Sequence, residues 1–101
     1  MPKVYVINDM RHSFEKAEAY GELVYVTKGK VPIFNTAASL EILQEGLKYF
    51  DVSKDYLLVT GHSLLCILAA LIVAKKAPGA AMQLLVFEAK QQDYVVRHIK
   101  V

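Results

Sequence analysis

The sequence predicts an α/β fold with a mostly parallel five-stranded sheet, and three observations support this prediction. Short runs rich in β-branched and aromatic residues alternate with longer runs that have the periodicity of helices. The chain has 101 residues, a length that suits a single domain at 1–101 with one core. The last two strand-like runs are separated by a short polar turn, so the final strand is expected to be antiparallel.

Five runs of the sequence are predicted to form strands, at residues 3–7, 22–27, 55–59, 83–87 and 94–101. The first run ends at Asn8 and Asp9, a pair that is typical of turns. Strands that alternate with helices favour parallel pairing through right-handed crossovers, as in Rossmann-like folds. The order 2-1-3-4-5 is one arrangement of this kind, with the last strand on an edge where two subunits can join their sheets; the sequence leaves open whether strand two or strand three neighbours strand one.

Three segments are predicted to form helices, at residues 13–20, at about 35–50 and at 64–76. Asn35 or Thr36 is expected to cap the second helix, and Gly46 inside it marks either close packing or a tolerated surface glycine. The apolar residues of that helix fall on one stripe, at Leu40, Leu43, Leu47 and Phe50. Residues 31–34 are expected to be extended, with Pro32 keeping them out of a central strand.

The region 56–74 contains no charged side chain and is long enough to suggest a membrane span. The break at residues 60–63, Thr-Gly-His-Ser, predicts instead a strand, a turn and a helix of a soluble domain without membrane contact. The helix at 64–76 has almost no polar face, which indicates burial on all sides. In a chain that is 54% hydrophobic, we expect this helix to contact a partner subunit, in a homo-oligomer that is most simply a dimer.

The charge pattern argues against nucleic acid as a partner. The formal net charge is only +2, and acidic and basic residues alternate along most of the chain. Cys66 is the single cysteine and lies in an apolar run, so we expect a buried thiol in a reducing compartment. The N-terminus enters a strand at once and lacks the features of a signal peptide. These observations predict a cytoplasmic protein.

Polar residues at the carboxyl ends of the first three strands are predicted to converge on one rim, where ligands bind in open α/β sheets. The candidate ligand-binding residues are Asp9, Lys28, Thr60, Gly61, His62 and Ser63. A glycine permits a tight turn, and hydroxyl groups with a lysine suit a small anion such as a phosphate or a nucleotide. Equally, any turn from strand to helix favours a glycine and a serine cap. The standard nucleotide motifs are absent, so no cofactor is predicted.

The segment Gly61-His62-Ser63-Leu64-Leu65 resembles the nucleophile elbow of α/β-hydrolases, G-x-S-x-G. However, Leu65 stands where that motif has its second glycine, and the chain is too short for the hydrolase fold. His98 is the only histidine downstream that could serve Ser63.

The three histidines, at 12, 62 and 98, form no i, i+4 pair, so no metal site is predicted. The sequence therefore favours a protein without catalytic activity.

Several segments together resemble short uncharacterised α/β proteins that are encoded by bacterial viruses. They are the opening Lys-Val-Tyr-Val-Ile-Asn-Asp, the strand and turn Asp-Tyr-Leu-Leu-Val-Thr-Gly, the apolar helix that follows, and Leu-Leu-Val-Phe-Glu before Asp-Tyr-Val. The resemblance implies a viral origin, a location in the host cytoplasm and an accessory or host-modulating role. It implies no activity.

Two functions are compatible with these observations. The first is a non-enzymatic protein that acts as a homo-oligomer or binds another macromolecule, as the excess of apolar residues indicates. The alternative is a protein that binds a small ligand, a nucleotide or a phosphate, at the carboxyl ends of the strands.

Overall fold

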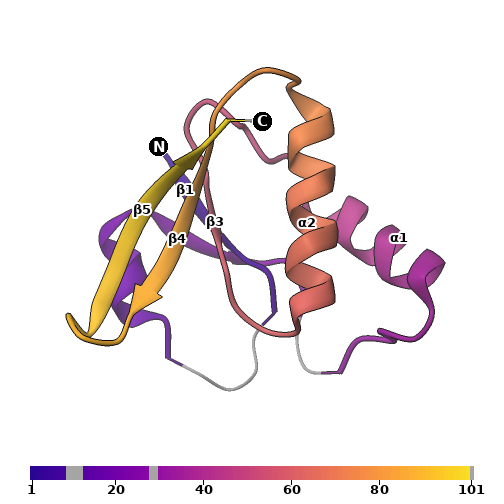
Figure 1. The fold of residues 1–101 in the computed structure, drawn as a ribbon, viewed down its shortest axis with the longest axis horizontal. Coiled ribbons are helices and arrows are strands. Elements are labelled where there is room, and N and C mark those ends of the chain that lie inside the picture. Colours follow the sequence, from indigo (N-terminus) through magenta and orange to yellow (C-terminus); the bar gives the residue numbers. More distant parts are fainter. Residues whose placement is uncertain (9–12, 28–29, 101) are drawn as a thin grey trace.

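The computed structural model describes residues 1–8, 13–27 and 30–100, and it confirms the α/β fold. Strands and helices alternate through most of the chain before a final pair of strands (Figure 1). In chain order the elements are β1 (Lys3–Val6), the 3₁₀ helix η1 (Glu15–Ala19), β2 (Glu22–Tyr25), α1 (Thr36–Gly46), β3 (Tyr56–Leu58), α2 (Ser63–Lys76), β4 (Met82–Glu88) and β5 (Asp93–Ile99).

The strands form one sheet in the order β2-β1-β3-β4-β5, as predicted. β1 pairs in parallel with both β2 and β3, and β3 pairs in parallel with β4. The last strand, β5, is antiparallel to β4, because the connection between them is a short turn. β2 and β5 are therefore the two edges of the sheet.

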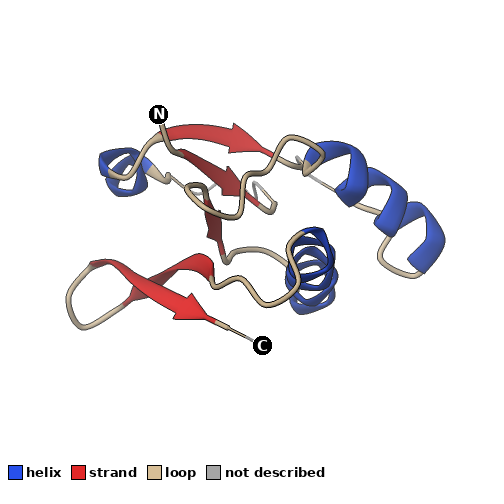
Figure 2. Ribbon diagram, turned by 90° about the horizontal axis from the view of Figure 1, so that it is seen from above, coloured by secondary structure: helices blue, strands red, loops and turns tan. Residues whose placement is uncertain are grey.

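The helices cover the two faces of the sheet unequally. Seen from above, α1 and α2 lie on one side of the sheet, and η1 lies on the other (Figure 2). Alternate residues of the central strands accordingly enter two different cores. Tyr5 and Leu57 pack in the core beneath α1 and α2, whereas Val4 and Leu58 pack in the smaller core beneath η1.

Two predicted helices differ in extent from the observed ones. The segment predicted at 13–20 forms only the five-residue 3₁₀ helix η1, because so short a run cannot offset the cost of starting an α-helix. α1 ends at Gly46 and not near Phe50. A Cβ atom at Gly46 would lie 2.6 Å from Val26 Cγ1, so this glycine marks the close packing of α1 on the chain after β2. Leu47 and Phe50 are nevertheless buried, as the predicted stripe requires.

Residues 31–34 form tight turns, so the prediction of an extended stretch is wrong. The Ile33 N–H donates to the Val31 carbonyl at 2.7 Å, and the Asn35 N–H donates to the Pro32 carbonyl at 2.9 Å. Asn35 then caps α1, as predicted, because its Oδ1 accepts the Ala38 N–H at 3.1 Å. The apolar side chains of this segment consequently project from a turn and not from a strand.

In the single chain, α2 is buried on one face only, and the predicted cover of its other face by a partner subunit stays a prediction. One face of α2 is buried, through Leu65, Leu68, Ala69 and Val73. On the opposite face, Ile67 is 57% exposed and Leu71 is 61% exposed. The chain is too small to supply a second layer over this face. Within the described part of the chain, no helix is long and apolar enough to cross a membrane.

A buried carboxylate joins the amino ends of the central strands. Asp55, immediately before β3, is 2% exposed. Its Oδ1 accepts the Lys3 N–H at 2.9 Å, and its Oδ2 accepts the Asp51 N–H at 2.8 Å. Burial and, to a smaller extent, the charge of Asp55 raise the pKa of Tyr5 on β1. The carboxylate is thus held in place by backbone donors from two segments that are far apart in the sequence.

We predict that Asp55→Asn destabilises the protein, because an amide group can accept only one of these two N–H donors. The expected loss is about 1–3 kcal/mol in the free energy of unfolding, measured by urea denaturation. Asp93→Asn is the matched control, since Asp93 is exposed and accepts only the neighbouring Tyr94 N–H. That control should change stability by less than about 0.5 kcal/mol. Equal losses in the two variants would contradict the role given to Asp55.

Candidate functional site

The candidate site lies where the carboxyl ends of β1 and β3 meet. Asn8 follows β1 and is 3% exposed, and the turn after β3 places Gly61 directly against it. Gly61 has a φ of +89°, and a Cβ atom added there would lie only 2.7 Å from Asn8 Cβ. A glycine is therefore required by both the backbone conformation and the space. This contact sets how closely the start of α2 approaches the end of β1.

His62, and not Ser63, caps α2. The Nδ1 atom of His62 accepts the Leu64 N–H at 3.1 Å, and Ser63 is the first residue of the helix. An imidazole nitrogen that accepts a hydrogen bond carries no proton, so in the neutral ring the proton is on Nε2. Nε2 is then a donor that is not used by the cap. The expected serine cap is replaced by a residue that offers a second polar atom.

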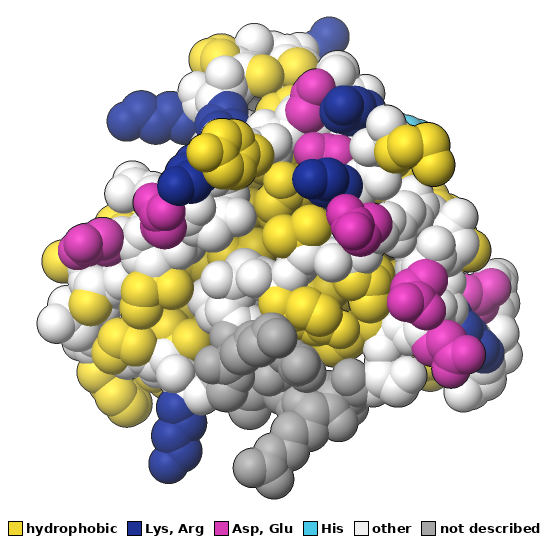
Figure 3. All heavy atoms as spheres, turned by 180° about the vertical axis from the view of Figure 1, so that it is seen from behind, with side chains coloured by type: hydrophobic (Ala, Val, Ile, Leu, Met, Phe, Trp, Pro, Cys, Tyr) yellow, Lys and Arg dark blue, Asp and Glu magenta, His cyan; other side chains and the backbone are white. Residues whose placement is uncertain are grey.

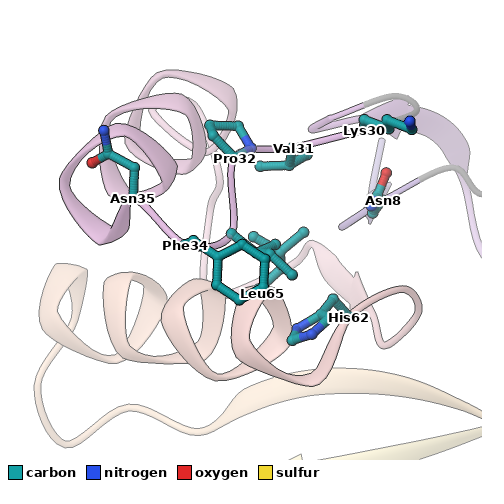
Figure 4. A pocket seen from close by; sticks show the side chains of 9 residues that line it. Asn8, Lys30, Val31, Pro32, Phe34, Asn35, His62 and Leu65 are labelled. Carbon is teal, nitrogen blue, oxygen red and sulfur yellow. The ribbon is translucent and has the colours of Figure 1, made fainter.

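A cavity of about 530 Å³ opens between the start of α2 and the turn segment before α1. Side chains from the chain just after β1, from this turn segment and from the start of α2 with its cap surround it (Figure 4). Its lining comprises Asn8, Lys30, Val31, Pro32, Ile33, Phe34, Asn35, His62 and Leu65. Leu65 and His62 come from α2 and its cap, Phe34 projects from the turn segment before α1, and Lys30 lies on the far side of the cavity from His62 (Figure 4).

The cavity is apolar with a few polar groups. Leu65 is fully buried at its base, and the Phe34 ring is 99% exposed at its mouth. Lys30 is the only charged residue among its lining residues, and it is exposed. None of the lining residues within the described part of the chain is acidic. No group of three or more His, Cys, Asp or Glu within residues 1–8, 13–27 and 30–100 is arranged to hold a metal ion.

The structure brings together only some of the candidate residues from the sequence. His62 lines the cavity, and Gly61 shapes it through its contact with Asn8. Thr60 lines a separate hollow with Phe14 and Tyr94, and Ser63 is exposed at the helix start. Asp9 and Lys28 lie outside the described residues.

The geometry does not support a hydrolase site at Ser63. His98 lies on β5 opposite Gln83, and its Nε2 is 3.2 Å from Gln83 Oε1. Gln83 in turn pairs with Tyr56, at the amino end of β3. Ser63 follows the carboxyl end of that strand. The serine and the histidine are therefore at opposite ends of the sheet, too far apart for proton transfer.

The sequence reasoning missed the residues that form most of the cavity wall. The sequence pattern predicts an extended chain for Val31-Pro32-Ile33-Phe34, and it places Leu65 in the apolar helix without a part in the rim. One signal was available, namely four apolar residues between two polar segments, with a proline that excludes them from the sheet interior. Such residues must project from a loop, where they can line a cavity.

Comparison with known proteins gives one match. The family model described as Phage Pam3 gp32-like protein matches residues 2–101. No curated protein and no solved structure matches the chain with significance. The match spans almost the whole chain and confirms the resemblance to proteins of bacterial viruses.

We predict that Gly61→Ala destabilises the protein more than Gly79→Ala. Both glycines have a positive φ, +89° and +82°, so an alanine is strained at either position. Only at Gly61 would the added Cβ collide with another residue, because nothing lies within 4 Å of a Cβ at Gly79. The additional loss should be about 1–3 kcal/mol in the free energy of unfolding, measured by urea denaturation. If the two variants lose the same stability, the contact with Asn8 is not a constraint.

We predict that Cys66 reacts slowly with thiol reagents in the folded protein. Burial raises the pKa of the Cys66 thiol, whose Sγ–H donates to the Thr60 carbonyl at 3.4 Å. Because the thiolate is the reactive form, modification near pH 8 should be at least about tenfold slower than in the urea-unfolded chain. The rate should keep rising with pH above the ordinary thiol pKa. A folded protein that reacts as fast as the unfolded one would contradict this placement.

Proposed function

The chain belongs to the phage Pam3 gp32-like protein family, and on this premise we propose that it is a non-catalytic viral accessory protein that works as a homodimer. The observation that carries the proposal is the outer face of α2, which consists of Ser63, Ile67, Ala70, Leu71 and Ala74. Ile67 and Leu71 are 57% and 61% exposed on this face. It contains no charged residue, since the charge-free region extends from residue 56 to residue 74. Exposed apolar helix faces without charges are typical of protein interfaces.

A second copy of the same chain suits this face. The basic residues of α2, Lys75 and Lys76, are both at its C-terminal end, and the helix has no acidic residue. In a parallel pair of helices, four lysines would lie together and repel one another. In an antiparallel pair centred near Ala69, Ile67 of each copy meets Leu71 of the other. The lysines are then separated by about 18 Å along the axis, beyond the screening length in physiological salt of about 8 Å.

The free energy from α2 alone is small. Covering the exposed parts of four side chains contributes roughly 1 kcal/mol each, which is comparable with the lowest estimates of about 4 kcal/mol for the cost of association. A stable interface also buries about 800 Å² on each partner. The edge strand β5 offers further surface, since Ile99 is 40% exposed and pairs with Met82 of the core beneath α2. We therefore propose an interface that extends from the outer face of α2 to β5.

A second apolar surface is a weaker candidate. Hydrophobic side chains fill the centre of the opposite side of the molecule, between charged side chains (Figure 3). A hollow of about 560 Å³ between β2 and α1 is lined by Val26 and Ile42, and also by Glu41 and Glu45. These carboxylates would have to leave water if a second chain covered the hollow. The outer face of α2 carries no such penalty.

We predict that Ile67→Lys weakens the dimer. Each substitution acts twice in a symmetric pair, so the dissociation constant should rise at least about tenfold, measured by sedimentation velocity over a range of concentrations. Ile42→Lys is the matched control, because it also replaces an exposed isoleucine, 38% exposed, with a lysine on a helix surface. Neither substitution should unfold the single chain, which the melting temperature of each variant checks.

Two results would overturn the proposal. One is a wild-type protein that remains monomeric at high micromolar concentration. The other is a dimer that Ile42→Lys disrupts and Ile67→Lys does not, which would move the interface to the side of β2 and α1.

A further inference from the structure

We propose that the cavity beside the start of α2 binds a small molecule with an apolar or aromatic body and one acidic group. This inference does not depend on the dimer, because the cavity is formed by a single chain between α2 and residues 30–35. It also differs from a bare phosphate site, because most of the cavity wall is hydrophobic.

The position of the cavity is the first argument. In the order β2-β1-β3-β4-β5, β2 pairs on one side of β1 and β3 pairs on its other side. The direction of the strand order therefore reverses between β1 and β3. In open α/β sheets, ligands bind outside the carboxyl ends of the strands at this point. Asn8 and the turn at Gly61 stand at those two strand ends and touch each other. The volume of about 530 Å³ is in the range of small-molecule sites.

The wall of the cavity selects an apolar body. Val31, Ile33 and Leu65 supply aliphatic surface, and Leu65 is fully buried. Phe34 is 99% exposed although it is one of the residues that line the cavity (Figure 4). A ligand in the cavity would cover one side of this ring and remove apolar surface from water. A flat or aromatic molecule fits this requirement best.

The polar groups of the cavity select an acidic group on that body. Lys30 supplies one positive charge, and it has no ion-pair partner among the described residues. His62, on the other side of the cavity from Lys30, supplies an Nε2–H donor in its neutral form, because Nδ1 is occupied by the Leu64 N–H; it can donate to a polar atom elsewhere on the ligand. None of the described lining residues is acidic. Donors without a protein acceptor favour a carboxylate, a sulfonate or a phosphate monoester on the ligand.

Two fluorescent probes of similar shape test both parts of the proposal. Anilinonaphthalene sulfonate has an aromatic body with an anionic group, and N-phenylnaphthylamine has the same kind of body without charge. We expect both to bind the wild-type protein, with the sulfonate binding more tightly. Phe34→Ala should weaken both probes by roughly tenfold, since one aromatic contact is lost. Lys30→Gln should weaken the sulfonate by about two- to fivefold and leave the neutral probe unchanged.

Three controls make the result decisive. Tyr49→Ala removes an aromatic ring that is 79% exposed on another part of the surface, and it should leave both affinities unchanged. Ile67→Lys should also leave them unchanged, because it alters only the outer face of α2. Inorganic phosphate should compete weakly or not at all with the sulfonate, whereas an aromatic carboxylate such as naphthoate should displace it.

The proposal is overturned if neither probe binds, or if binding is insensitive to Phe34→Ala and is lost in Ile67→Lys, which would place the probes on α2. It is also overturned if inorganic phosphate displaces the sulfonate as effectively as an aromatic carboxylate does, because the cavity would then recognise the anion alone.

Discussion

The carboxylate of Asp55 is the interaction on which the arrangement of the central strands depends. Parallel strands have no hairpin turn to set their register, so another device must align them. Here the Asp55 side chain accepts one N–H from the start of β1 and another from the turn before β3. Because Asp55 is 2% exposed, neither bond can be replaced by water without opening the core. The alignment at the amino ends of β1 and β3 is carried along both strands to their carboxyl ends.

At those carboxyl ends, the same alignment creates the surroundings of the cavity. Gly61 can lie against Asn8 only if β1 and β3 end at the same level. The close contact then directs α2 across the sheet, and the His62 cap fixes where the helix begins. α2 thereby has two separate roles. Its first turn borders the cavity, and the outer face further along the helix is available to a partner.

Local sequence patterns were sufficient for the mostly parallel sheet and the antiparallel last strand, because these follow from alternation and turn length. They left open the neighbour of β1, which the structure shows to be β2 on one side and β3 on the other, and the choice between Asn35 and Thr36 as the cap of α1. Tertiary contacts decided the rest. The end of α1 depends on how closely Gly46 approaches Val26, which the sequence does not reveal. The apolar composition of α2 indicated burial on every side, yet burial of Ile67 depends on whether a second layer exists. The predicted rim stays a prediction, and the cavity wall at residues 31–34 became visible only when their turns were known.

The central position of β1 has a consequence for the time at which the fold can form during synthesis. The hydrogen bond from Lys3 to Asp55 spans 52 positions of the chain. At about 5–20 residues per second, translation takes several seconds to deliver β3 after β1 has emerged. Until then, β1 has β2 on one side and an unpaired edge on the other. The nascent chain, more than the folded protein, is therefore the stage at which β1 is exposed to pairing with the wrong strand.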